Sequence, residues 1–347
     1  MENFIEFSGR RIGKGSPPYI IAEACINHEG DIGRAREMVL VARDMGCDAI
    51  KFQIHILSDE MLKNTPQSDN FDESLYDALE RTNLSVEEHK ELKAYCCSVG
   101  IHYMCTPFSC ASVDVLEGEI GVDVFKVGSG ELTNLPLQRH IAKKGKPMIV
   151  STGMAMDDEI KETVEVLVAE KAKFVLMHCV SIYPCPYERV NLGNIPKLQS
   201  RYGVPVGLSD HTSSIYTGLG AVALGANIIE KHFTLDRNMK GPDHSSSIEP
   251  RELGELVKGS RAIFKAMGEE KRIFPEEEQI KSWARESVVS LCFIPAGTLI
   301  ANDMVSVKRP APFDDIIAAK HLDDIIGRVA VTDISENSQI RWSQLGE

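Results

Sequence analysis

Acidic, basic and imidazole side chains stand at the ends of several short apolar runs of the chain. Glu23 ends the first run, Lys51 and Lys126 lie near the ends of two others, and His211 and His232 follow the last two. Imidazole with carboxylate suits Mn²⁺, Fe²⁺, Zn²⁺ or Co²⁺ better than Ca²⁺, and two lysines in one cavity require an anion to neutralise them. The residue types therefore predict a divalent metal site and a site for a phosphate or carboxylate. Two alternatives remain, because Glu23 could pair with Lys51 and each histidine could be a packed core residue.

Two segments that contain glycine and serine follow neighbouring apolar runs and suit anion binding. They are Gly-Ser-Gly at 128–130 and Ser-Thr-Gly at 151–153. Hydroxyl groups and unobstructed backbone N–H groups can surround a phosphate. Glycine is common in such loops, so these segments indicate an anion site only together with the two lysines.

Short apolar runs alternate with helical segments, and this alternation must position the reactive groups. Such runs are typical of parallel strands covered on both faces, and eight units in about 250 residues match a closed (β/α)₈ barrel. Catalytic residues in this architecture come from the carboxyl ends of several strands. The helical segments include residues 32–45, 86–98, 157–170 and 214–224. The eight expected strands are residues 19–24, 49–53, 102–106, 122–127, 148–151, 174–178, 204–208 and 227–232.

The composition changes after residue 267, which predicts a second domain. Residues 269–281 are dense in charge and read as a solvated helix or linker, and short strand-like runs with turn residues follow from residue 286. We therefore expect a barrel domain at 1–280 and a small β-rich domain at 286–347. Residues 59–81 are long and polar for one connection, and we interpret them as an excursion over the barrel rim.

The overall composition narrows the class of protein. A net charge of −13 disfavours nucleic acid as a partner, and no apolar run is long enough for a membrane span. The polar amino-terminal segment lacks the apolar core of a signal peptide, and nine cysteines without a CxxC pair are expected to be reduced. We expect a cytoplasmic enzyme.

The motifs of the chain, taken in order, resemble those of the sialic acid (N-acetylneuraminate) synthase family. The first is Ile-Ile-Ala-Glu-Ala-Cys-Ile-Asn-His-Glu-Gly at 20–30, and the tail, with Ile-Pro-Ala-Gly at 294–297 and Val-Lys-Arg-Pro at 307–310, resembles the family's antifreeze-like (SAF) domain. The motifs between them are Lys-Phe-Gln at 51–53, Thr-Pro-Phe at 106–108, Lys-Val-Gly-Ser-Gly-Glu at 126–131, Ser-Thr-Gly-Met at 151–154, Gly-Leu-Ser-Asp-His-Thr at 207–212, Glu-Lys-His-Phe-Thr at 230–234 and Gly-Pro-Asp-His at 241–244. The resemblance covers essentially the whole chain and is specific as an ordered set.

The resemblance implies a reaction and the roles of its residues. Phosphoenolpyruvate would condense with the open-chain aldehyde of an N-acylated mannosamine, most simply N-acetylmannosamine, to give a nonulosonic acid and phosphate. His211 and His232 would hold a divalent metal, most often Mn²⁺ with Mg²⁺ or Co²⁺ as alternatives, which acts as a Lewis acid, and Glu23 would be the acid–base group. The substrate-binding residues would be Lys51, Gln53, Thr106, Lys126, Ser129, Glu131, Ser151, Ser181, Tyr183, Ser209, Glu230, Asp243 and Arg309.

The resemblance also implies a domain-swapped homodimer, in which the small domain of one subunit covers the barrel of its partner and brings Arg309 to that site. The chain departs from the family pattern at three places. Cys25 replaces the usual Gly, Ser181 replaces a frequent Asn, and Ala-Pro-Phe-Asp-Asp at 311–315 replaces a loop that contains Gly.

Three other functions fit parts of the pattern. A metal-free aldolase could form a Schiff base at Lys126 or Lys51. A sugar-binding protein without catalysis could retain the fold, although it would not need Glu23 and both histidines. Within the family, the acceptor could be a deoxy-diacetamido sugar, as in legionaminic or pseudaminic acid synthesis.

Overall fold

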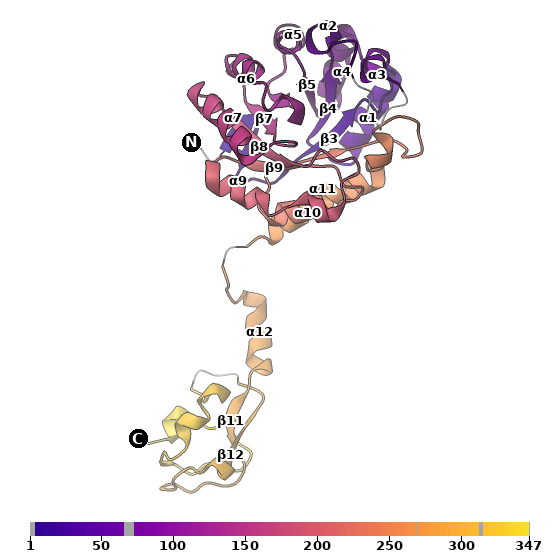
Figure 1. Ribbon diagram of the computed structural model, residues 1–347. Helices are drawn as coiled ribbons and strands as arrows, with labels where there is room; N and C mark the ends of the chain where they lie inside the picture. Colours follow the sequence, from indigo (N-terminus) through magenta and orange to yellow (C-terminus); the bar gives the residue numbers. More distant parts are fainter. Residues whose placement is uncertain (1–3, 66–72, 269, 312–314, 347) are drawn as a thin grey trace. The chain divides into compact units, whose positions relative to one another are not determined.

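The chain folds into two units, Met1–Gly268 and Glu269–Glu347, shown in Figure 1. The computed structural model describes residues 4–65, 73–268, 270–311 and 315–346. Parts of the expected excursion at 59–81 and of the 311–315 loop lie outside the described residues.

Eight parallel strands form the sheet of the first unit, in the order β5-β4-β3-β10-β9-β8-β7-β6. The two strands at the ends of this order, β5 and β6, are in contact, so the sheet is a nearly closed barrel. All eight strands predicted from the sequence are confirmed, with ends that differ by up to three residues. They are β3 (Tyr19–Cys25), β4 (Ala49–Ile54), β5 (His102–Pro107), β6 (Phe125–Val127), β7 (Met148–Ser151), β8 (Phe174–Cys179), β9 (Val206–Asp210) and β10 (Ile228–His232).

Helices lie around these strands, as Figure 1 shows, and their ends follow from local sequence signals. Asp31 caps the first helix by accepting hydrogen bonds from Gly33 N and Arg34 N, and Ser85 forms a capping box with Glu88. Among the described residues, none of the helices combines the length and the apolar character that a bilayer span requires. The helices of the first unit are α1 (Ile32–Asp44), α2 (Leu57–Glu60), α3 (Leu75–Thr82), α4 (Val86–Val99), α5 (Cys110–Val115), α6 (Leu135–Ala142), α7 (Asp157–Ala169), α8 (Tyr187–Val190), α9 (Asn194–Tyr202), α10 (Tyr216–Ala223) and α11 (Pro250–Ala266).

An apolar layer fills the amino-terminal end of the barrel. Its members are buried and face inward from successive strands: Tyr19, Ile21, Ala49, Met104, Val124, Ile149, Val175, Met177 and Ile228. A hairpin of β1 (Phe4–Phe7) and β2 (Arg10–Gly13) packs Ile5, Phe7 and Ile12 into the same cluster. The sequence analysis did not predict this hairpin, which closes the amino-terminal end of the barrel.

The second unit contains a small core and a short antiparallel sheet. Strands β11 (Ser287–Ser290) and β12 (Val305–Lys308) pair, and isolated bridges join other segments, including Leu299 with Val329. Val288, Ile294 and Ile317 belong to its buried apolar cluster. The charge-dense segment includes α12 (Pro275–Ala284), which has no buried residue, as expected of a solvated helix.

Candidate active site

A layer of charged residues lies directly above the apolar layer, toward the carboxyl ends of the strands. Inward positions repeat every second residue, so Glu23, Lys51 and Glu230 each follow an apolar inward residue two positions earlier. Lys51 forms ion pairs with Glu23 and, at 3.8 Å between Nζ and Oε2, with Glu230. Lys126 reaches the other oxygen of Glu230 at 3.6 Å. Glu230 therefore lies between two lysines and neutralises part of their charge.

Burial and the neighbouring charges separate the two carboxylates electrostatically. Burial raises the pKa of Glu23 to about 7, against the opposing effect of Lys51. Burial also acts on Glu230, but the charges of Lys126 and Lys51 outweigh it and lower the pKa of that carboxyl. Glu230 is therefore a fixed counter-ion, whereas Glu23 can hold or release a proton near neutral pH.

Hydroxyl groups and one glycine form a cradle beside Lys126. Lys126 Nζ donates to Ser151 Oγ at 2.7 Å, and the backbone N–H of Gly153 donates to Ser129 Oγ at 3.1 Å. A Cβ atom placed on Gly153 would lie only 2.4 Å from Ser181 Oγ and 2.6 Å from Ser129 Oγ. The hydroxyls of the predicted anion site thus converge on one small space. Two further predicted hydroxyls lie in the charged layer, where Lys51 donates to Thr106 at 3.1 Å and Ser209 donates to Glu230 at 3.0 Å.

Filling the cradle provides a first test. We expect Gly153→Ala to weaken phosphoenolpyruvate binding by at least about tenfold, because the new methyl group displaces the hydroxyls of Ser129 and Ser181, and one lost hydrogen bond to a charged group is worth about 1.5–3 kcal/mol. Gly130→Ala is the matched control, since its Cβ would meet no atom within 4 Å. Calorimetric titration measures both, and equal affinities in the two variants would contradict the cradle.

His211 follows β9 and His232 ends the neighbouring strand β10, so the two rings lie side by side at the barrel mouth. Their ring centroids are 5.3 Å apart, and the Tyr183 ring lies 4.1 Å from that of His211. His211 Nδ1 donates to the backbone oxygen of Val180 at 2.7 Å, which leaves the lone pair on Nε2. Burial lowers the pKa of His232 well below its usual value, and among the described residues its Nδ1 has no hydrogen-bond partner. Burial opposes a charge on His211, but the contact with Cys179 outweighs burial and raises the pKa of that imidazole. In their neutral forms, the two imidazoles offer His211 Nε2 and His232 Nδ1 as ligands for a divalent metal.

Gln53, Glu131 and Asp243 lie at the upper edge of the site. Gln53 accepts a hydrogen bond from His55 Nε2 at 3.2 Å, and Asp243 precedes the short helix η3 (His244–Ser246). Burial raises the pKa of Glu131 to about 7. The structure thus brings the predicted residues of the barrel to one end of it.

The raised pKa of Glu131 predicts a pH-dependent stability. Since the folded state holds this proton more tightly than the unfolded chain, the ionised carboxylate destabilises the fold increasingly as the pH rises from about 4.5 through 7. We expect Glu131→Gln to leave stability unchanged at about pH 4.5 and to raise it by about 1–3 kcal/mol at about pH 8. Denaturant titrations at both pH values measure this difference, and a gain that is equal at both would contradict the explanation.

Three further residues, His178, Cys179 and Arg309, differ in how they relate to the predicted site. His178 donates to the backbone oxygen of Val190 at 2.6 Å, which confirms its interpretation as a packed residue. Cys179 is the inward residue of β8, 3.9 Å from His211 Nδ1 and 3.4 Å from Ser129 Oγ, and the sequence analysis missed it. The alternation Val175, Met177, Cys179 could have identified it. Arg309 is exposed and belongs to the second unit, so its assignment to the site stays a prediction.

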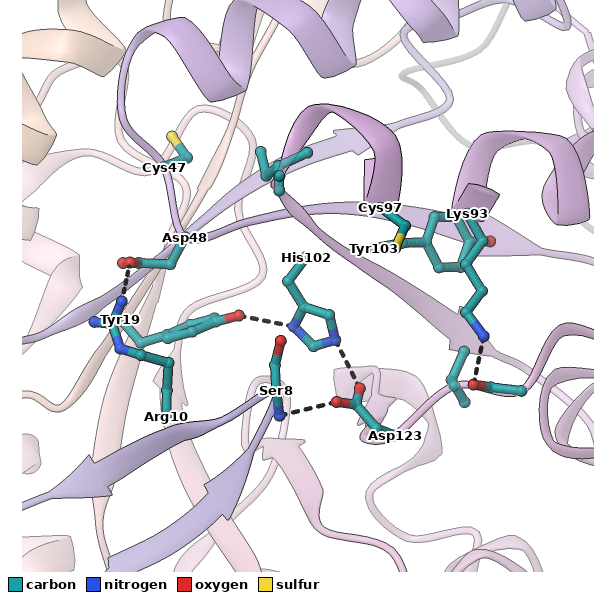
Figure 2. A pocket seen from close by; sticks show the side chains of 14 residues that line it. Ser8, Arg10, Tyr19, Cys47, Asp48, Lys93, Cys97, His102, Tyr103 and Asp123 are labelled. Atoms are coloured by element: carbon teal, nitrogen blue, oxygen red, sulfur yellow. Dashed lines mark hydrogen bonds and ion pairs between the residues drawn. The ribbon is translucent and has the colours of Figure 1, made fainter. Parts of the chain in front are cut away.

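Another pocket lies at the opposite, amino-terminal end of the barrel (Figure 2). Its volume is about 570 Å³, and Tyr19, His102 and Asp123 form a hydrogen-bonded chain along it. Tyr19 Oη and His102 Nδ1 are 2.7 Å apart, and His102 Nε2 and Asp123 Oδ1 are 2.6 Å apart. These polar groups already satisfy one another and join the hairpin to the barrel, so this pocket has a structural role.

Fold and site together define a parallel β/α barrel with a cluster of lysines and hydroxyls beside a pair of imidazoles. Two family models match the chain, the NeuB family over residues 38–272 and the SAF domain over residues 285–346. The chain belongs to the NeuB family and carries a SAF domain, and it is an enzyme of this family. The resemblance inferred from the sequence motifs is confirmed.

Curated relatives and a solved structure agree with this assignment. N,N'-diacetyllegionaminic acid synthase of Campylobacter jejuni is 40% identical over 332 residues, with 93% of this chain and 98% of the relative covered. N-acetylneuraminate-9-phosphate synthase of Homo sapiens is 33% identical, with 96% and 94% covered. The crystal structure of N-acetylneuraminic acid (sialic acid) synthetase from Leptospira borgpetersenii, in complex with citrate, has a TM-score of 0.71 at 35% identity and covers 80% of this chain and 94% of its own.

Proposed function

We propose that the enzyme condenses phosphoenolpyruvate with the open-chain aldehyde of an N-acylated mannosamine and water, giving a nonulosonic acid and inorganic phosphate. One observation carries the proposal: Glu23, the Lys126 cradle and the two histidines converge at one end of the barrel. The reaction requires a proton-transferring group, which Glu23 would supply, and a site for a phosphorylated carboxylic acid, which the Lys126 cradle would supply. It also requires a means of polarising an aldehyde, for which the two histidines would hold a metal.

The residues divide the chemistry among them. Lys126, Ser129, Ser151 and the N–H of Gly153 bind and orient the phosphate. Lys51 and Thr106 bind beside it and hold Glu23 in place, while Glu23 transfers a proton as water adds to C2 of the condensed substrate. Loss of phosphate by C–O cleavage then completes the reaction. A divalent metal held by His211 and His232 would supply Lewis acidity toward the sugar aldehyde.

Two acceptors are in question. The sequence analysis favours N-acetylmannosamine, which we retain as the first acceptor. A deoxy-diacetamido sugar is the second, because identity to the N,N'-diacetyllegionaminic acid synthase, at 40%, exceeds the 33% to the human neuraminate-9-phosphate synthase.

The deciding experiment supplies phosphoenolpyruvate with each acceptor separately and measures phosphate and nonulosonic acid together. Chelator-treated enzyme is assayed with and without Mn²⁺, Mg²⁺ and Co²⁺. We expect metal-dependent release of both products in equal amounts with one acceptor at much higher kcat/KM. Phosphate release without nonulosonic acid, or no product with either sugar, would refute the proposed reaction.

One observation favours a rival. Burial lowers the pKa of Lys126, which is the direction that a Schiff-base lysine needs, whereas the carboxylates of Glu23 and Glu230 outweigh burial and raise the pKa of Lys51. Borohydride reduction in the presence of pyruvate would attach the substrate to Lys126 if the rival holds. We expect no adduct by mass spectrometry.

We also propose a homodimer in which the second unit of the partner brings its Arg309 to the barrel mouth. Arg309 is exposed, and an exposed guanidinium is accessible to a substrate held by another subunit. Mixing inactive Glu23→Gln subunits with inactive Arg309→Ala subunits would restore activity if the site is shared. We propose a cytoplasmic location, and the nine free cysteines support this proposal because disulfides are rare in that compartment.

A further inference from the structure

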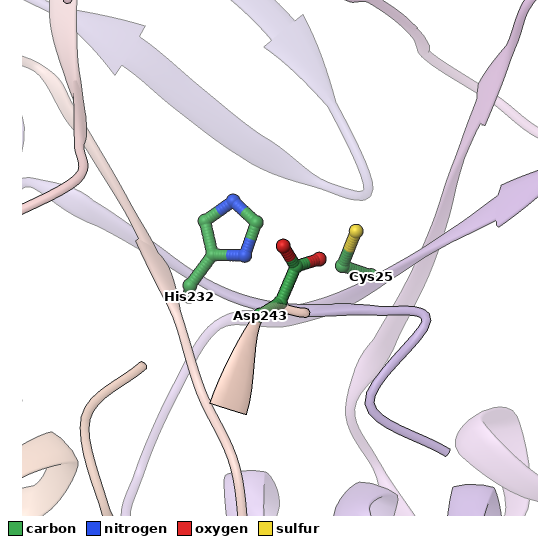
Figure 3. Close-up of side chains that lie close together, drawn as sticks. All are labelled: Cys25, His232 and Asp243. Carbon is green, nitrogen blue, oxygen red and sulfur yellow. The ribbon is translucent and has the colours of Figure 1, made fainter. Parts of the chain in front are cut away.

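Cys25 lies beside the two residues with which it could share a metal ion. Figure 3 shows Cys25, His232 and Asp243 side by side, and one ligand atom from each lies within 4.8 Å of the others. They come from the end of β3, the end of the neighbouring strand β10 and the loop after β10. A thiolate, an imidazole and a carboxylate are three of the ligand types that bind divalent transition metals.

The backbone at Cys25 has an unusual conformation. Its φ is +47°, in the left-handed region that favours glycine. The register between β3 and β4 shifts between Glu23 and Cys25, a bulge that allows both side chains to point into the barrel. A cysteine here carries a conformational cost that glycine would not. Such strain is typical of functional positions, since nothing in the local turn requires a side chain.

Imidazole lone pairs near Cys25 are available to a ligand, and the Cys25 thiol forms a hydrogen bond with the Asp243 carboxylate. His232 is buried, and its Nδ1 has no hydrogen-bond partner within the described residues. His211, whose ring lies 5.3 Å from that of His232, has its Nε2 lone pair free because Nδ1 donates to Val180. A buried imidazole nitrogen without a partner is costly unless it binds something.

We propose that Cys25 and Asp243 complete, with His232 and His211, a four-residue metal site that contains sulfur. This inference deepens the proposed function and rests on it for the role of the metal. Binding transfers the thiol proton of Cys25 to solvent, and the thiolate becomes the ligand. Because thiolate favours zinc, cobalt and iron over magnesium and manganese, the site should select these metals over Mn²⁺. A site with the two histidines alone is expected to hold Mn²⁺, so the proposed metal preference differs from that expectation.

Cobalt spectroscopy on the full-length protein tests the site without substrate. Chelator-treated protein is titrated with Co²⁺, and a thiolate ligand adds a sulfur-to-cobalt charge-transfer band in the near ultraviolet. We expect this band in the natural protein and its loss in Cys25→Gly, which folds because glycine suits the left-handed backbone. Zn²⁺ affinity should fall by at least about tenfold in the same variant. Removing only a hydrogen-bond partner of a metal ligand already weakens metal binding to about this extent.

Two controls separate the alternatives. Cys179→Ala removes the other cysteine near His211 and should keep the band. Asp243→Asn should also keep the band but weaken Co²⁺ binding. A natural protein without the band, or a band retained in Cys25→Gly, would overturn the proposal. An absent band with normal synthase activity would refute only the sulfur ligand, whereas a normal band without synthase activity would refute only the proposed reaction.

Discussion

Replacing Lys126 with methionine is expected to reduce both the stability of the barrel and its affinity for phosphoenolpyruvate. Glu230 would keep only Lys51, 3.8 Å away, as a counter-ion, and Ser151 would lose its charged donor. Removing one partner of a buried ion pair costs about 3–5 kcal/mol of folding free energy. Loss of a charged hydrogen bond to phosphate should weaken binding by roughly 10- to 150-fold. Denaturant titration and calorimetry measure the two losses separately.

A double variant separates the two roles of Lys126. Adding Glu230→Gln to Lys126→Met removes the unpaired charge and should recover most of the lost stability. It should not recover phosphoenolpyruvate binding, because the cation of the cradle is still missing. Recovery of binding in the double variant would mean that Lys126 acts only as a structural partner of Glu230.

Replacing Glu23 with glutamine is expected to lower kcat by about 10²–10⁴, the usual contribution of a general acid–base group. Glutamine keeps the shape and can still accept a hydrogen bond from Lys51, so affinity for phosphoenolpyruvate should change little. Rapid-quench measurement of phosphate release reports the chemical step, and calorimetry reports the affinity.

The control for Glu23 is Glu230→Gln, because both carboxylates contact Lys51 and both substitutions remove one negative charge. Burial raises the pKa of Glu23 to about 7, whereas the two lysines lower that of Glu230, so of these two carboxylates Glu23 is the one that can exchange a proton near neutrality. We expect kcat of Glu230→Gln to fall much less. Equal losses would show that the charge on Lys51, and not proton transfer, accounts for the effect.

The barrel could be predicted because its strands are buried on both sides. All seven residues of β3 are buried, and such continuous apolar runs are visible in the sequence. The β1–β2 hairpin was missed, since its strands are only four residues long and mix apolar residues with charged ones without a regular alternation. It gains stability from contact with the barrel interior, through Ile5, Phe7 and Ile12, which no local pattern reveals.

Most of the candidate site could be predicted because strand ends in this fold share one face. The sequence could not show that Glu230 lies between two lysines, since that depends on which side chains reach across the barrel. It identified Cys25 as a departure from a family pattern. Only the register shift at Glu23 and Cys25 shows that its sulfur lies near His232 and Asp243.

The hairpin that closes the amino-terminal end of the barrel also constrains the order in which ligands can bind and leave. Because apolar side chains of the described residues fill that end, we expect a ligand at the charged layer to enter and leave through the mouth, past Tyr183 and the histidines. A second molecule bound at this upper edge would obstruct the exit of the first. We therefore expect the ligand at the charged layer to bind before the ligand at the upper edge and to leave after it.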